Sequence, residues 1–203
     1  MSPGIASPPS PKDGPDEEAR HGSVTSARLE SGVGVLSPQW TRYPSDVDRD
    51  EMLRVLRAFD QEGLEYVLIG AAAMGFHGLV RATEDLDIFI RATAENVERL
   101  KRAFQAAYDN DPNVDEIKAA DLLGDYPAVR YYPPSGDLYF DVMTRLGEVA
   151  SFDTVSAQTK SVEGISVRVA TPAALFRLKK DTGRPLDRQD AEVLRREFDL
   201  EDD

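Results

Sequence analysis

The sequence predicts one α/β domain that follows a tail rich in proline and serine. Helical and strand patterns alternate along residues 47–203, which is typical of a sheet flanked by helices. The chain has 203 residues, 41% apolar and 30% charged, enough for one ordinary hydrophobic core. Residues 1–46 differ: they hold seven of the 13 prolines and almost no apolar periodicity. We therefore expect residues 1–46 to be disordered and residues 47–203 to fold.

The predicted domain begins with a helix, a strand and a second helix. Residues 48–62 form an amphipathic helix that ends at Gly63. Its apolar face recurs at helical spacing, at Met52, Val55, Leu56 and Phe59. The short apolar run at residues 66–69 suits a buried strand. A glycine-led stretch of helix formers, residues 70–78, follows it directly.

A second strand and two helices come next. Residues 86–90 form an apolar strand. Residues 93–109 form a helix with Thr93 as N-cap, because a threonine oxygen can accept a backbone N–H in the first turn. Residues 114–123 are predicted as a further, less regular helix.

The C-terminal half is predicted to supply more strands and then two helices. Residues 127–132 and 137–143 form a hairpin around the turn composition at 133–136, and residues 165–169 alternate as a half-buried strand. Thr171 then caps a helix that has proline at its first position and ends near residue 180. A final helix covers residues 186–198. The expected fold is a small mixed sheet flanked by helices, with helices at the C-terminus.

Composition excludes several classes of protein. The chain has no cysteine, so disulfides and thiolate metal sites are excluded and a cytoplasmic location is expected. No apolar run approaches the roughly 20 residues of a membrane span, and the N-terminus lacks the apolar core of a secretory signal. The net charge of −13 argues against holding DNA by bulk attraction, so no DNA partner is expected.

The residues with the clearest chemistry lie around the first two strands. Gly70 ends a strand and opens a helix, which places unpaired backbone N–H groups where an anion can bind. Asp85 and Asp87 follow, separated by one residue, so both side chains point to the same face of the second strand. Like charges at this spacing repel unless a divalent cation neutralises them. The pair could otherwise be a solvated strand edge.

A third carboxylate, Asp141, interrupts the apolar strand at residues 137–143. Buried charges need a partner. A metal shared with Asp85 and Asp87 would supply one, and three carboxylates from neighbouring strands would hold two Mg²⁺ ions. An ordinary ion pair with Arg130 or Arg145 is the alternative.

The ordered set Gly70-Ala71, Asp85-Leu86-Asp87 and Asp141 resembles the signature of the DNA polymerase β nucleotidyltransferase superfamily. The segments flanking it, at residues 76–83 and 175–190, are similar to the small bacterial nucleotidyltransferases of the abortive-infection toxin type. The resemblance covers residues 50–198 and implies a nucleotidyltransferase fold. Superfamily members place Gly or Ser after the first glycine, whereas Ala71 has no hydroxyl.

The resemblance also implies roles for individual residues. Asp85, Asp87 and Asp141 would bind the metal ions, and Asp141 would act as a base-like ligand for the acceptor hydroxyl. Nucleotide phosphates would be held by Gly70, Ala71, Lys179, Arg81 and Arg184. The acids Asp187 and Asp190 would orient Lys179 or Arg184.

The implied activity is transfer of a nucleoside monophosphate from an NTP such as ATP to an acceptor, with release of pyrophosphate. The toxin-like flanks favour a tRNA 3′ end as acceptor and a cognate antitoxin as partner. Three alternatives stay open. They are an aminoglycoside or lincosamide nucleotidyltransferase, an antitoxin that adenylylates a protein, and a degenerate binding module, to which Ala71 points.

Overall fold

The computed structural model describes residues 46–79, 81, 83–125 and 127–201. The predicted disordered tail, residues 1–46, lies outside this part of the chain except for residue 46. No helix within the described part is long and apolar enough to cross a membrane.

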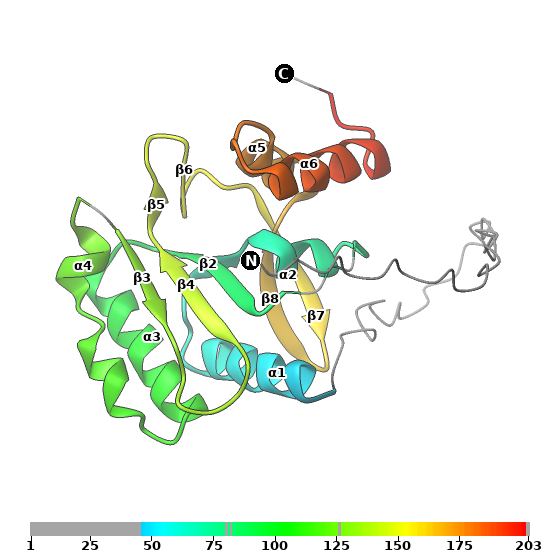
Figure 1. Cartoon of the computed structure of the whole chain (residues 1–203). Coiled ribbons are helices and arrows are strands. Elements are labelled where there is room, and N and C mark those ends of the chain that lie inside the picture. The colour runs from blue at the N-terminus through cyan, green and yellow to red at the C-terminus, as the bar shows by residue number, and fades with distance from the viewer. Residues whose placement is uncertain (1–45, 80, 82, 126, 202–203) are drawn as a thin grey trace, which may run out of the picture. The chain divides into compact units, whose positions relative to one another are not determined.

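Helices and strands alternate in the described part, as the sequence predicts (Figure 1). The helices are α1 (Asp46–Gln61), α2 (Gly70–Gly75), α3 (Ala94–Ala107), the 3-10 helix η2 (Pro112–Glu116), α4 (Ala119–Leu123), α5 (Pro172–Lys180) and α6 (Pro185–Glu197). The strands are β1 (Tyr66–Leu68), β2 (Asp85–Ile90), β3 (Ala128–Tyr131), β4 (Tyr139–Met143), β5 (Arg145–Leu146), β6 (Ala150–Ser151), β7 (Ala157–Val162) and β8 (Ile165–Ala170).

Six strands form one mixed sheet in the order β3-β4-β2-β1-β8-β7. Strand β2 is antiparallel to β1 and parallel to β4, and β1 is parallel to β8. The outer strands β3 and β7 each pair with a neighbour in an antiparallel hairpin. This mixed sheet with flanking helices confirms the predicted fold class.

Helices α1 and α3 pack side by side over one face of the sheet (Figure 1). The Phe104 ring of α3 lies 4.9 Å from the Phe140 ring of β4, and Phe59 of α1 lies 5.1 Å from Tyr66 of β1, both measured between ring centroids. The aromatic rings join a continuous apolar core. Because side chains alternate along a strand, the neighbours of Phe140 in β4 point to the opposite face.

Two capping predictions are confirmed. The Thr93 side chain accepts a hydrogen bond from the Asn96 backbone N–H at 3.2 Å, and Thr171 accepts one from Ala174 at the same distance. Pro172 occupies the first turn of α5. These local signals fix where α3 and α5 begin.

The prediction of a single helix over residues 114–123 is wrong. The chain forms η2 and α4 instead, because Ile117 and Lys118 between them adopt extended backbone conformations. The side chains of Val114, Ile117 and Leu122 are all buried, so the break lets this segment place its apolar residues against the core. Burial therefore outweighs the continuity of a helix here.

Strand β7 and the two-residue strands β5 and β6 were not predicted. Strand β7 reads Ala-Gln-Thr-Lys-Ser-Val and is half exposed at the edge of the sheet, so it lacks the apolar alternation of a core strand. The sequence contains one signal of a hairpin at this point, the pair Glu163-Gly164. Glu163 and Gly164 join β7 to β8 with positive φ angles of 48° and 79°, the geometry of a tight hairpin turn.

Candidate functional site

The parallel pairing of β2 with β4 brings the three predicted aspartates together. Asp87 lies opposite Asp141 in the register, and Asp85 is two residues before Asp87 on the same face. This is the face opposite to the one that α1 and α3 cover. One carboxylate oxygen from each residue lies within 4.8 Å of the others. All three side chains are half-buried, so the cluster is reachable from solvent.

The donor set fits Mg²⁺. In an octahedral Mg²⁺ site adjacent ligands are roughly 3 Å apart and opposite ligands roughly 4.2 Å apart. Both separations are below the 4.8 Å that bounds the distances between these oxygens. Carboxylate oxygens are hard ligands that suit magnesium, calcium or manganese rather than zinc or copper. Asp85, Asp87 and Asp141 could therefore hold one or two such ions after small side-chain rotations.

Hydroxyl groups orient the Asp85 carboxylate. The Thr83 side chain donates a hydrogen bond to Asp85 Oδ1, and the Tyr139 hydroxyl lies 3.4 Å from Asp85 Oδ2. Tyr139 pairs with Asp85 across β2 and β4 and so faces the same side of the sheet. Its position next to Asp85 depends on this pairing, which the sequence does not reveal.

Gly70 lies directly against Asp87. Its φ is +68°, and a Cβ built on it would collide with Asp87 Oδ2 and lie 2.9 Å from Asp87 Cγ. The backbone N–H of Ile69 also donates to the Asp87 carbonyl at 2.9 Å. Gly70 and Ala71, the predicted phosphate-binding residues, thus begin α2 beside the acid cluster. Close approach of the backbone to the carboxylate requires glycine here.

Burial, followed by the charges of Asp85 and Asp141, raises the pKa of Asp87 from 3.8 to about 7. Nearby Lys179 and Arg184 act in the opposite direction. A carboxylate whose ionisation is this unfavourable gains from a neighbouring cation. The electrostatics of the cluster therefore favour metal binding.

We expect Mg²⁺ affinity to rise with pH up to about 7 and then to level off. The ion needs the ionised carboxylate, so below the Asp87 pKa each pH unit should weaken binding by up to about tenfold. The stability of the metal-free protein should depend on pH in the opposite direction. Because the folded pKa exceeds the unfolded value of 3.8, its stability should fall as pH rises from 3.8 to about 7. Calorimetric titration with MgCl₂ and urea unfolding across this range would measure both trends, and a pH-independent affinity would contradict the first.

Arg130 makes a bidentate contact with Asp141. Its Nε and Nη2 donate to the two carboxylate oxygens, each at 2.6 Å. The two residues face each other across the antiparallel β3–β4 pair. Of the two ion pairs considered for Asp141, the structure contains the one with Arg130. Asp141 thus belongs both to the acid cluster and to an ion pair.

Lys179 is buried and held by two aspartates of α6. Its Nζ lies 3.0 Å from Asp187 Oδ1 and 2.9 Å from Asp190 Oδ2. The Thr182 hydroxyl also donates to Asp187, at 2.8 Å. The acids therefore contact Lys179, one of the two residues that the resemblance implies they orient. Its charge lies close enough to the cluster to lower the pKa of Asp87.

The two predicted arginines lie around the same aspartates. Arg81 Nε is 3.7 Å from Asp190 Oδ2, and Arg184 Nε is 3.9 Å from Asp187 Oδ2. Arg184 is 84% exposed in its side chain, so its guanidinium is available to a ligand. Both arginines thus border the Lys179 network rather than the carboxylates of β2 and β4.

Replacing Lys179 with Met should destabilise the fold by about 3 kcal/mol. It removes the cation that both Asp187 and Asp190 hydrogen-bond and leaves these largely buried carboxylates with the longer ion pairs to Arg184 and Arg81. Urea unfolding followed by circular dichroism would measure the loss. Lys118→Met removes an exposed ammonium and serves as the matched control. Equal stability of the two variants would show that Lys179 has no structural role.

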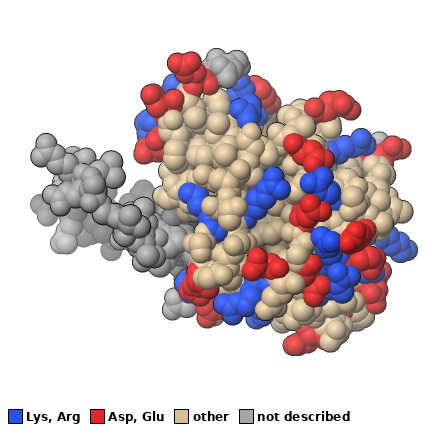
Figure 2. Space-filling model, turned by 180° about the vertical axis from the view of Figure 1, so that it is seen from behind, with Lys and Arg blue, Asp and Glu red and all other residues tan. Residues whose placement is uncertain are grey.

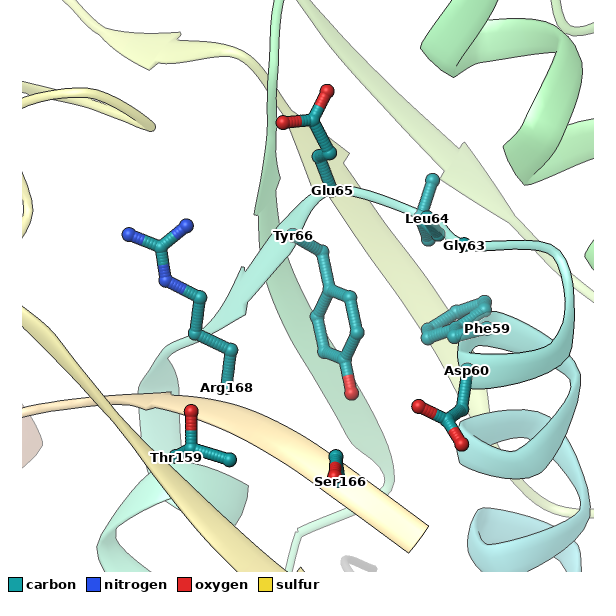
Figure 3. Close-up of a pocket in the computed structure, with 9 residues that line it drawn as sticks. All are labelled: Phe59, Asp60, Gly63, Leu64, Glu65, Tyr66, Thr159, Ser166 and Arg168. Atoms are coloured by element: carbon teal, nitrogen blue, oxygen red, sulfur yellow. The ribbon is translucent and has the colours of Figure 1, made fainter.

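A separate pocket of about 240 Å³ lies where α1 ends near β1, β7 and β8 (Figure 3). The Tyr66 hydroxyl points between Asp60 and Ser166 in this view. None of the residues lining the pocket belongs to the acid cluster or to the Lys179 network. The pocket is therefore distinct from the candidate site.

Comparison with known proteins finds no matching protein-family model and no curated protein with a matching sequence. Among solved structures, the chain is similar to an antigenic nucleotidyltransferase-like protein from Paracoccidioides brasiliensis. The similarity has 16% sequence identity and a TM-score of 0.45, and it covers 71% of this chain and 74% of that one.

Proposed function

We propose that the chain is a magnesium-dependent nucleotidyltransferase of the DNA polymerase β type, which transfers a nucleoside monophosphate from an NTP to an acceptor hydroxyl. The observation that carries the proposal is the convergence of Asp85, Asp87 and Asp141 on one face of the sheet, beside Gly70. Transfer of this kind needs positioning and charge neutralisation more than covalent catalysis. When bound, two divalent ions would supply the charge neutralisation.

Individual residues of the chain would have different roles in the transfer. Asp141 would accept the proton of the acceptor hydroxyl, while Gly70 and Ala71 would orient the triphosphate through backbone N–H groups. Lys179 and Arg184 would place positive charge on the same side, a role supported by their effect on the pKa of Asp87. Pyrophosphate would then leave from this side of the cluster.

For the acceptor, we propose a tRNA 3′ end modified in the cytoplasm, with ATP among the candidate donors and a cognate antitoxin as partner. This finer proposal rests on the toxin-like segments at residues 76–83 and 175–190. Antibiotics and proteins are the competing acceptors.

A second candidate function is a binding module without catalysis. The contact between Arg130 and Asp141 favours it, because the guanidinium satisfies the carboxylate without a metal ion. The missing hydroxyl at Ala71 points the same way. In such a module an isosteric change at Asp87 would leave the biological effect intact.

The decisive experiment incubates the purified full-length chain with Mg²⁺ and each α-³²P-labelled NTP. Total tRNA, candidate proteins, and aminoglycoside and lincosamide antibiotics are offered separately as acceptors. Label in one class supports the enzyme and identifies its acceptor. If a correctly folded protein transfers no label to any of them, the binding module becomes the better explanation.

A further inference from the structure

Two tyrosine rings border the acid cluster on the side of β3 and β4. Tyr132, directly after β3, is 60% exposed, and its ring centroid lies 5.3 Å from that of Tyr139 at an interplanar angle of 32°. Tyr132 is the one aromatic residue among the exposed large hydrophobic residues of the described chain. Tyr139 contacts Asp85, so the pair leads from solvent directly to the cluster.

Arg130 contacts both tyrosine side chains and the acid cluster. Its guanidinium carbon lies 4.9 Å from the Tyr139 ring centroid, and its Nη1 is 3.4 Å from the Tyr132 hydroxyl. The same guanidinium binds Asp141. We refer to Arg130, Tyr132 and Tyr139 as the β3–β4 platform. It offers an exposed aromatic face next to a cation, which are the two groups that bind a nucleobase and its phosphate.

Arg130 and Tyr132 of the platform lie on the opposite side of the aspartates from the proposed phosphate-binding residues. In the sheet order, β3 lies beyond β4, which carries Asp141, whereas β1, which leads into Gly70, lies on the other side of β2. The attacking and leaving groups of a nucleotidyl transfer lie roughly in line, on opposite sides of the reacting phosphorus. If pyrophosphate leaves toward Gly70, the acceptor must approach from the platform.

Charge limits how much of a nucleic acid the site can hold. The chain carries a net charge of −13, and on the face drawn in Figure 2 acidic and basic side chains are interspersed without one broad basic surface. Long contact with a phosphate backbone would require many cations. Stacking of a single base requires none, so this chain is suited to binding the end of a strand.

We infer that the β3–β4 platform is a stacking subsite for the terminal base of a single-stranded nucleic-acid acceptor, with Tyr132 as the residue that contacts the base. The inference rests on the proposed function, which places the acceptor on this side. It assigns selection of the acceptor to residues outside the predicted metal and phosphate sites.

The test measures binding of two fluorescent single-stranded oligoribonucleotides to the full-length chain with Mg²⁺ and without NTP. The oligonucleotides are identical except that one lacks its 3′-terminal base. We expect the base to strengthen binding by about tenfold, as stacking on one aromatic ring does. The slope of log K against log salt should stay near about −0.7, the value for one phosphate contact.

Matched variants show whether the preference for the terminal base depends on the Tyr132 ring. Tyr132→Ala should remove the preference for the terminal base, whereas Tyr132→Phe and Tyr132→Trp should keep it. Leu123→Ala, which shortens an exposed apolar side chain of α4, should change nothing. The inference is overturned if the wild-type chain binds both oligonucleotides equally. It is also overturned if Tyr132→Ala retains the preference or Tyr132→Phe loses it.

The outcome separates this inference from the proposed function. Transfer of label to an antibiotic or a protein, with no preference for the terminal base, would overturn the platform and leave the nucleotidyltransferase in place. A base preference that depends on Tyr132, with no label transfer to any acceptor, would support the platform as a nucleic-acid binding site and refute the enzyme.

Discussion

Asp87→Asn should reduce nucleotidyl transfer by at least about a thousandfold, because the metal ions it helps to hold supply several kcal/mol of charge stabilisation. The fold should not suffer. Burial, and after it the charges of Asp85 and Asp141, raises the pKa of Asp87, so a neutral amide of the same shape removes a charge that the folded protein disfavours. We therefore expect the midpoint of thermal unfolding to stay the same or to rise in the metal-free protein. Label transfer and calorimetric Mg²⁺ binding would be measured on the same preparation.

Asp121→Asn is the matched control, because Asp121 is an exposed carboxylate on α4. It should keep full activity. A loss of activity at Asp87 with unchanged stability is difficult to explain by a structural role. If Asp87→Asn remains active and still binds Mg²⁺, the assignment of the acid cluster as a metal site fails.

Gly70→Ala should strongly reduce activity by a different route. The added methyl group would occupy the position of the Asp87 carboxylate, so either that side chain or the start of α2 must shift. A positive φ costs a non-glycine residue a further roughly 1–2 kcal/mol. A displacement of about 1 Å in a catalytic group can cost about a hundredfold in rate. We expect weaker Mg²⁺ binding, lower stability and a rate reduced by at least that factor, measured by calorimetry, urea unfolding and label transfer.

The control for backbone strain is Gly63→Ala. Gly63 has nearly the same φ, +61°, but a Cβ there would meet nothing within 4 Å. The Gly63→Ala variant should lose as much stability from backbone strain as Gly70→Ala does, but it should keep the activity and Mg²⁺ affinity of the wild-type chain. Equal activity of the two variants would mean that contact between Gly70 and Asp87 does not matter for function.

Local patterns in the sequence were enough to predict most elements and part of the site. The spacing of Asp85 and Asp87 places both on one face of any strand, whatever surrounds it. Thr93 and Thr171 mark helix starts because the capping bond forms within four residues. Features that depend on a few consecutive residues can be recognised without knowing their neighbours.

Other features had a weak local signal or none. Strand β7 is polar except at its two ends, so only the turn at Glu163-Gly164 marks it, and it pairs with β8 along its whole length. The break between η2 and α4 depends on where the core lies. Lys179 reads in sequence as a basic residue at a helix end, and only the packing of α5 on α6 makes it a buried cation between two aspartates.

By itself, the sequence determined that two carboxylates share one strand face after a glycine-led helix start. That follows from the two-residue repeat of a strand and from glycine's access to positive φ. Only the tertiary structure decided that Asp141 lies opposite Asp87 and that the β3–β4 platform lies beside the acid cluster. The order of strands in a sheet is set by burial and pairing among distant segments, and no short stretch of the chain contains that information.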